Sequence, residues 1–161
     1  MSYPPPHYLG PAGEISATYR PAATPPELTY ANGNTVHYLA TGASTHGLFG
    51  LYRWEMGAQR SGPDPHYHRS ISESFYILSG SVRIYDGRRW IDTAPGDFVH
   101  VPEGGIHAFA NESGEPASML LHFSPGAPRE AYFEGLPNLS SLTPLERDEF
   151  MLTHDTFWLD D

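Results

Sequence analysis

The middle of this sequence is a series of short hydrophobic segments separated by turn residues. Between residues 35 and 123, apolar and polar side chains alternate over short stretches bounded by Gly, Asn, Asp and Ser. Asp86-Gly87 divides two of these stretches, and Asp-Gly between alternating segments is a strong hairpin signal. Many short strands with tight turns are typical of an all-β sandwich or barrel. The expected strands are 35–41, 47–56, 73–78, 82–85, 89–91, 97–101, 106–111 and 117–123.

The pattern changes after Ser124-Pro125-Gly126. Residues 129–136 can form a short helix, and Thr143-Pro144-Leu145-Glu146 has the capping Thr, the first-turn Pro and the Glu of a capping box, which predicts a second helix to about residue 153. We therefore predict three parts: an extended Pro-rich arm at 1–34, a barrel at 35–124 and a helical tail at 125–161. The tail should pack its large aromatic residues on the barrel or on a partner chain, because such a patch is rarely left in water. These residues are Tyr132, Phe133, Phe150, Phe157 and Trp158.

Composition and charge exclude several classes of protein. The chain has 161 residues, which favours one domain with a real core, and a net charge of −10, which argues against nucleic acid and anionic membranes as partners. All nine basic residues are Arg, so no lysine Schiff base can form, and the lack of Cys excludes disulfides and thiolate metal sites. The N-terminus lacks the pattern of a signal peptide and no stretch is long enough to span a membrane, so we expect a cytoplasmic protein.

Four residues form a pattern that suits a metal ion. His66 and His68 are two apart, so on a strand both side chains face the same side. Glu73 begins an apolar stripe, where a carboxylate is costly unless a cation neutralises it. His107 follows later in the chain. Three imidazoles and a carboxylate are ligands that borderline divalent metals favour, and the set does not distinguish Fe, Mn, Ni, Co, Cu and Zn.

The same residues resemble the two conserved motifs of the cupin family. The second motif matches throughout, in Gly96, Pro102, Gly104, His107 and Asn111. The first motif matches in His66, His68, Glu73 and Gly80, but its leading glycine falls on Arg60, with Gly62 the nearest glycine. The resemblance implies a double-stranded β-helix, a jelly-roll barrel that holds one divalent transition metal ion between two antiparallel sheets.

Within the cupins, the sequence is similar to small bacterial quercetinases, which are flavonol dioxygenases. The runs Glu73-Ser74-Phe75-Tyr76-Ile77 and Pro95-Gly96-Asp97-Phe98 carry this resemblance. It implies a dioxygenase that acts on a small aromatic, flavonol-like or polyketide-like substrate with molecular oxygen, and we expect a homodimer. Glu73 is then the candidate catalytic base as well as a ligand. Two alternatives remain: a redox-neutral metal-dependent cyclase, isomerase or lyase, and a non-enzymatic metal-dependent protein that binds a small molecule.

Several further side chains are candidates for the pocket. On 47–56, either the set with Tyr52 and Trp54 or the set with Arg53 and Glu55 must face inward, and the aromatic set suits either the core or a platform for a planar substrate. The candidates for the substrate pocket are Tyr52, Trp54, Phe75, Phe109 and His122. A structural or solvent-facing role is favoured for both His100 and His122. His154-Asp155 in the tail is either a partner of the metal ligands or a helix end, and the helix end is favoured.

Overall fold

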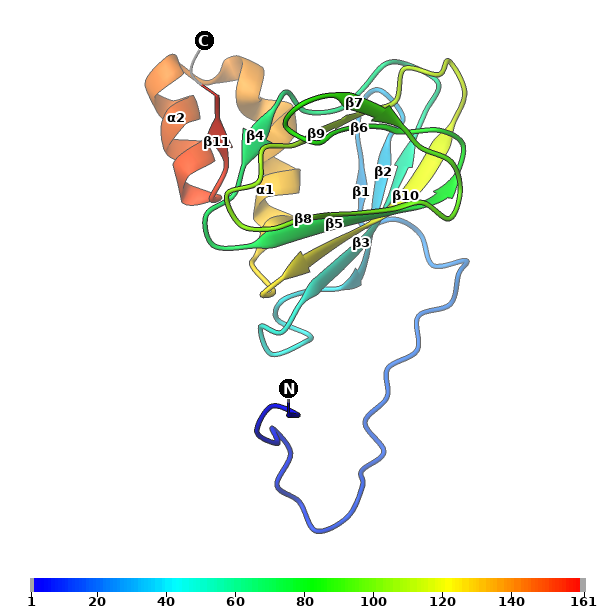
Figure 1. Ribbon diagram of the computed structural model, residues 1–161, viewed down its shortest axis with the longest axis vertical. Helices are drawn as coiled ribbons and strands as arrows, with labels where there is room; N and C mark the ends of the chain where they lie inside the picture. The colour runs from blue at the N-terminus through cyan, green and yellow to red at the C-terminus, as the bar shows by residue number, and fades with distance from the viewer. Residues whose placement is uncertain (1, 160–161) are drawn as a thin grey trace.

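The computed structural model describes residues 2–159, in which two β-sheets face each other and a helical segment packs at one side (Figure 1). Of the two facing sheets, the larger has six strands in the order β1-β2-β3-β10-β5-β8 and the smaller has three in the order β7-β6-β9, while β11 and β4 form a separate two-stranded sheet. All paired strands run antiparallel. This confirms the predicted all-β fold.

The strands are β1 (Leu28–Thr29), β2 (Thr35–Ala40), β3 (Gly50–Met56), β4 (His66–Tyr67), β5 (Ser72–Ser79), β6 (Arg83–Tyr85), β7 (Trp90–Asp92), β8 (Phe98–Val101), β9 (Ala108–Ala110), β10 (Ala117–Ser124) and β11 (Phe157–Trp158). The helices are α1 (Arg129–Gly135), the 3-10 helix η1 (Leu136–Ser141) and α2 (Pro144–Thr153).

Alternation along β3 decides which of its faces is the core. Tyr52 and Trp54 are buried, whereas Arg53 and Glu55 lie on the other face and form an ion pair at 2.8 Å. Pleating places successive side chains on opposite faces, so this strand can be apolar inside and charged outside. The aromatic set is therefore the inward one.

The tail is docked on the barrel, as the sequence predicts. Thr143 and Glu146 form the expected reciprocal capping box, with Pro144 at the first turn of α2. Tyr132 and Phe133 of α1 are buried and join the hydrophobic core. Because these aromatic side chains leave water on docking, the tail and the barrel form one hydrophobic unit.

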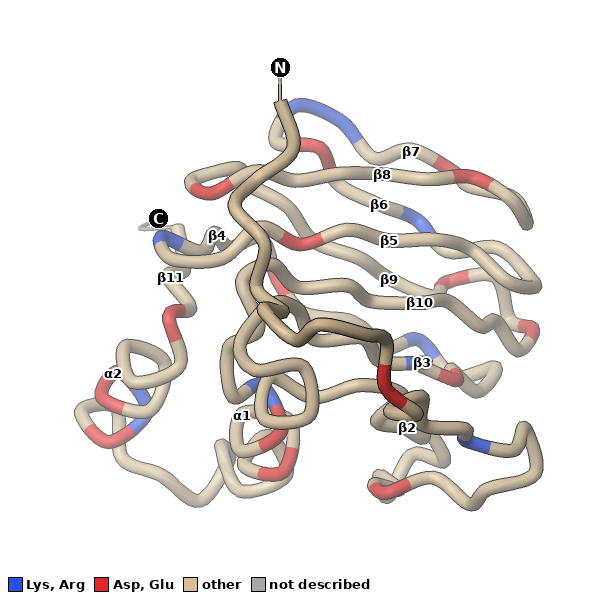
Figure 2. The backbone as a smooth tube through the Cα atoms, turned by 90° about the horizontal axis from the view of Figure 1, so that it is seen from below, with Lys and Arg blue, Asp and Glu red and all other residues tan. Residues whose placement is uncertain are grey.

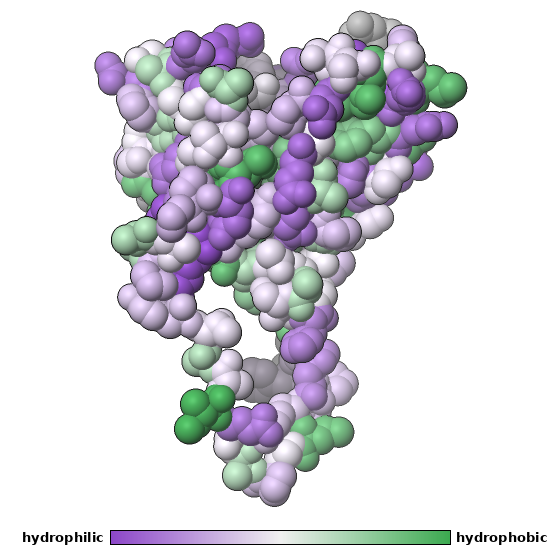
Figure 3. Space-filling model, turned by 180° about the vertical axis from the view of Figure 1, so that it is seen from behind, coloured by the Kyte–Doolittle hydropathy of each residue, from purple (hydrophilic) through white to green (hydrophobic). Residues whose placement is uncertain are grey.

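The N-terminal segment contributes little to this core. Residues 2–19 carry no helix or strand and lie away from the sheets, and the space-filling view shows them as a thin extension from the body of the molecule (Figure 3). Leu9 and Ile15 are among its exposed apolar side chains. Across residues 2–159, no helix has the length and apolar character needed to cross a membrane.

Candidate metal centre

The four candidate ligands converge between the two sheets. His66, His68, Glu73 and His107 each expose 4% or less of their surface, and their candidate ligand atoms all lie within 4.8 Å of one another. His66 and His107 are held side by side by a reciprocal pair of backbone hydrogen bonds, each 2.9 Å long. Glu73 enters from the second residue of β5. Backbone pairing of distant strands thus assembles the cluster.

Two of the imidazoles are oriented by carbonyls of their own loops. His66 Nδ1 lies 2.8 Å from the carbonyl oxygen of Asp64, and His107 Nδ1 lies 2.9 Å from that of Gly105. A carbonyl can only accept, so in both rings Nδ1 carries the proton and donates it. The neutral form of each ring then leaves the Nε2 lone pair free for a metal ion.

The third imidazole is oriented by the tail. His68 Nδ1 donates to the backbone carbonyl of Asp155 across 2.6 Å. The Asp155 carboxylate in turn accepts hydrogen bonds of 2.8–3.1 Å from the backbone N–H groups of Arg69 and Ser70. His154-Asp155 is therefore both the end of α2 and a partner of a candidate ligand, through a carbonyl that side-chain patterns do not reveal.

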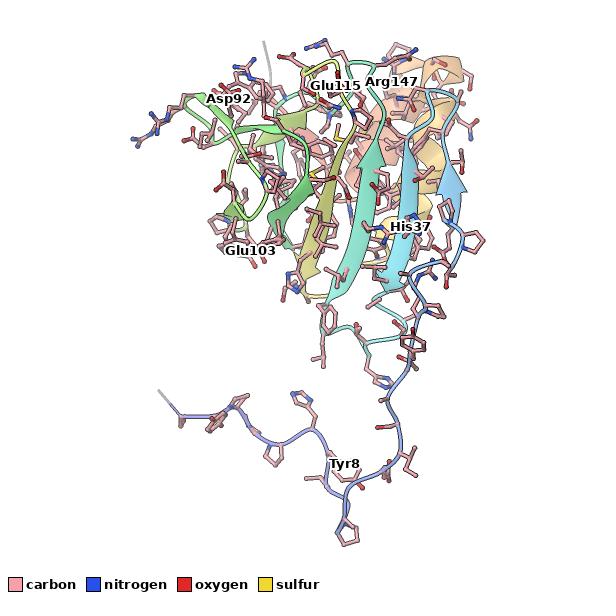
Figure 4. The ribbon with its side chains drawn as sticks, turned by 90° about the vertical axis from the view of Figure 1, so that its right-hand side faces the viewer. Tyr8, His37, Asp92, Glu103, Glu115 and Arg147 are labelled. Carbon is pink, nitrogen blue, oxygen red and sulfur yellow. The ribbon has the colours of Figure 1, made fainter. Side chains whose placement is uncertain are left out.

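This contact yields a testable prediction about metal affinity. Asp155→Ala removes the carboxylate that ties the tail to Arg69 and Ser70, so the Asp155 carbonyl should orient His68 less firmly. Loss of such outer partners typically weakens metal affinity by about 10–100-fold. Titration with Zn²⁺ against a competing chelator measures the change. The control is Asp92→Ala, which removes an exposed carboxylate on β7 (Figure 4). Equal affinity in Asp155→Ala and wild type would show that this contact does not support the site.

The chemistry of the donor set suits a metal ion. Glu73 Oε2 lies 3.2 Å from His68 Nε2 and 2.9 Å from His107 Nε2. When both rings are neutral with the proton on Nδ1, these three atoms are all acceptors, and their lone pairs repel unless a proton or a metal ion lies between them. The buried group therefore fits a divalent metal ion and can bind one.

The pKa shifts follow from the same geometry. Burial and the neighbouring His107 lower the pKa of His66 to about 3, so His66 is neutral at physiological pH. Burial alone would raise the pKa of Glu73 and lower that of His107. Hydrogen bonds outweigh burial: those from His107 and His68 lower the pKa of Glu73, and the one to Glu73 raises that of His107. The carboxylate is therefore ionised and ready to neutralise a cation.

Gly62 explains the departure in the first motif. Its φ of 142° lies in the region open to glycine, and a Cβ there would collide with the carbonyl of Phe109. Ser61 bridges to Asn111 beside it. Gly62 thus allows the close approach of two chain segments, and Arg60 is an exposed residue paired with Glu112.

A cavity of about 940 Å³ opens onto the cluster. His66 and Glu73 line it, and most of its wall is aromatic or aliphatic. The tail supplies a large share of that wall. The apolar lining residues from the tail are Tyr132, Phe133, Leu136, Pro137, Leu139, Met151 and Trp158. The Trp158 ring centroid lies 5.3 Å from that of His66, because β11 pairs with β4.

Only some of the predicted pocket residues line the cavity. Trp54 and Phe109 line the cavity. Tyr52 and Phe75 are inward but fully buried in the core behind it, with no exposed surface. His122 follows the inward Leu121 on β10 and therefore lies on the opposite face, stacked against Phe49 with ring centroids 5.6 Å apart. The structure thus places Tyr52, Phe75 and His122 outside the cavity lining.

His100 also lies away from the cluster. It is exposed on β8, and its Nδ1 lies 2.9 Å from the hydroxyl of Ser74. This agrees with the structural or solvent-facing role that the sequence favours.

The paired antiparallel sheets and the enclosed His–His–Glu–His cluster define a jelly-roll β-barrel with a centre that can bind a metal. Residues 52–123 match the family model described as "Cupin domain".

One curated relative and two solved structures illustrate the likeness. Quercetin 2,3-dioxygenase from Bacillus subtilis is 38% identical over 48 residues, which are 30% of this chain and only 14% of the relative. The structure of KdgF from Halomonas sp. has a TM-score of 0.60 at 14% identity, and covers 71% of this chain and 98% of its own. A predicted oxalate decarboxylase from Thermotoga maritima has a TM-score of 0.58 at 19% identity, covering 68% and 99%. The two structures show the fold.

Proposed function

We propose that this protein is a metal-dependent dioxygenase that acts on a small aromatic molecule of the flavonol or polyketide type. The observation that carries the proposal is the cavity of about 940 Å³ whose aromatic walls lead to His66 and Glu73. Its size lies within the range of small-molecule sites, and its lining is mostly apolar with a few polar groups, as such sites usually are.

The walls favour a planar substrate. The Trp54 ring lies edge-on to Phe109 and to Phe133, with centroids 6.2 Å and 5.2 Å away. Trp158 adds a further ring beside His66. Aromatic rings favour offset-stacked or edge-to-face partners, so this wall selects for flat, conjugated ligands. The chain thereby holds the reacting part of such a molecule close to the candidate ligands.

The chain's own groups have distinct roles in this proposal. The three histidines, through Nε2, and Glu73 would hold a divalent metal ion, which would supply Lewis acidity and redox chemistry toward oxygen. Glu73 is the buried carboxylate of the cluster and accepts the proton of a substrate hydroxyl. The apolar wall excludes water around the reacting atoms, which strengthens electrostatic interactions inside.

The partial match to quercetin 2,3-dioxygenase supports the reaction class. It falls on a short stretch of that longer protein, so it supports a dioxygenase without choosing the substrate.

Oxygen dependence tests the proposal. Metal-loaded protein is screened against flavonols and aromatic polyketides, with oxygen uptake and ¹⁸O₂ incorporation as readouts and chelator-treated protein as the control. We expect turnover that stops under strict anaerobiosis and products that contain ¹⁸O. Turnover at the same rate without oxygen would contradict the proposed dioxygenase activity and favour a redox-neutral cyclase, isomerase or lyase. Tight binding without turnover of any compound would favour a binding protein.

A further inference from the structure

Arg129 is a buried positive charge in the wall of the cavity. The residue is 4% exposed and lines the cavity beside the candidate metal centre. Its guanidinium lies 4.1 Å from the ring centroid of Tyr132 and 5.2 Å from that of Phe123. Nη1 donates to the carbonyl of His154 across 2.7 Å, whereas Nε has no hydrogen-bond partner. Within residues 2–159, no carboxylate forms an ion pair with it.

Other arginines of the chain are arranged differently. Arg20, Arg53 and Arg60 form ion pairs with Glu27, Glu55 and Glu112, and at least a quarter of each of these arginine side chains is exposed. An unpaired charge costs far more in an apolar interior than at the surface. Packing against aromatic rings offsets part of that cost. An uncharged side chain of similar length would pack against the same rings without this cost of burying a charge. The charge of Arg129 therefore calls for an explanation.

The charge balance of the cavity points to an anion. Burial lowers the pKa of Arg129, while Tyr132 and Glu73 act in the opposite direction, and an arginine remains charged throughout the physiological range. Glu73 is the one negative group of the ligand cluster. With a divalent ion in place, Glu73 cancels only one of the ion's two charges, and Arg129 adds another. The two other charged lining residues, Asp64 and Arg147, cancel each other. The loaded cavity is therefore strongly positive, although the whole chain carries −10.

A second unpaired donor lies in the same wall. The indole Nε1 of Trp54, which lines the cavity, is buried without a hydrogen-bond partner. Buried donors without acceptors are uncommon and call for an explanation. Trp54 and Arg129 together favour a ligand that brings hydrogen-bond acceptors.

We propose that Arg129 binds a carboxylate of the substrate, so that within the proposed class the natural substrate is an aromatic acid of the polyketide type rather than a neutral flavonol. The acid group pairs with the guanidinium, while a hydroxyl or carbonyl oxygen of the same molecule faces His66 and Glu73. This inference rests on the proposed function for the identity of the site, but binding alone tests it.

The probes are salicylate and salicylamide, which share a shape and differ in charge. Protein loaded with redox-inert Zn²⁺, and metal-free protein beside it, are titrated with each while tryptophan fluorescence is followed, since Trp54 and Trp158 line the cavity. We expect at least about tenfold tighter binding of salicylate, in keeping with a hydrogen bond to a charged group. Arg129→Met should abolish this preference and Arg129→Lys should retain part of it. The control Arg88→Met removes the same charge from an exposed turn and should match wild type.

An undiminished preference for salicylate in Arg129→Met would overturn the inference, because the carboxylate would then be bound by other groups. Equal affinity of wild type for both probes would overturn it as well. If Arg129→Met fails to fold, NMR spectra of the arginine Nε–H groups in ¹⁵N-labelled wild type test the inference instead. One of them should shift with salicylate and not with salicylamide, and no such shift contradicts the proposal. Zn²⁺ supports no oxygen chemistry, so this result is independent of the oxygen-uptake experiment.

Discussion

Replacing Glu73 by glutamine is expected to lower turnover by about a hundredfold or more, which is typical for the loss of a general base. Gln keeps the shape of the side chain and an oxygen that can still face the ion, so part of the metal should remain bound. It removes the negative charge and the ability to accept a proton. Steady-state turnover at a measured metal content separates loss of the base from loss of the ion.

The matched control for this variant is Glu115→Gln, which makes the same change at an exposed position in the loop before β10 (Figure 4). It should leave turnover unchanged. If Glu73→Gln turned over at the wild-type rate per bound metal, Glu73 would be a ligand alone, and the base would have to lie elsewhere.

The double variant His66→Ala/His68→Ala is expected to lose nearly all bound metal. Two of four ligands disappear, and both come from a single short stretch that contributes to one side of the cluster. Metal affinity depends on ligand count and geometry, so the loss should reach several orders of magnitude. Elemental analysis of protein purified without chelator measures it, against about one ion per chain in wild type.

His100→Ala is the control for this experiment, because His100 is exposed and outside the cluster. It should keep the wild-type metal content. Full occupancy in the double variant would refute the assignment of the site, and a loss in His100→Ala as large as in the double variant would show that the loss of metal is not specific to the cluster.

Local signals predict most of the barrel. Turn residues such as Asp86-Gly87 mark the ends of strands, and alternation assigns faces, so β6 and β7 pair across that turn as expected. The capping box at Thr143 similarly fixes the start of α2, because its hydrogen bonds join residues three apart. Such features depend on neighbours in sequence, which a pattern records directly.

The ligand cluster is also predictable, because its chemistry is unusual. Inward imidazoles and a carboxylate on apolar stripes require a common explanation, and the motif spacing supplies it for His66, His68, Glu73 and His107. The faces of individual strands are less secure. His122 shows this, since its strand has buried and partly exposed positions in alternation and a single residue does not reveal its register.

The residues that the tail contributes to the cavity wall could not be predicted from the sequence. Arg129, Tyr132 and Trp158 reach the site because the tail folds back over the barrel and β11 pairs with β4. That docking depends on burial of aromatic surface between segments far apart in the chain, and no local pattern specifies its orientation. The tube view shows α1 and α2 to one side of the sheets, with charged residues on both helices (Figure 2). The support of His68 by a backbone carbonyl of Asp155 is concealed for the same reason.

The central claim is that these four side chains hold one metal ion at the floor of the aromatic cavity. Anomalous diffraction, from crystals of protein purified without chelator and measured at the absorption edge of the metal found by elemental analysis, tests it directly. The account predicts one strong peak per chain, at about 2.0–2.2 Å from Nε2 of His66, His68 and His107 and from a Glu73 oxygen. A peak at any other position, or a metal-free cluster with its histidines bridged to Glu73 by protons alone, would contradict it.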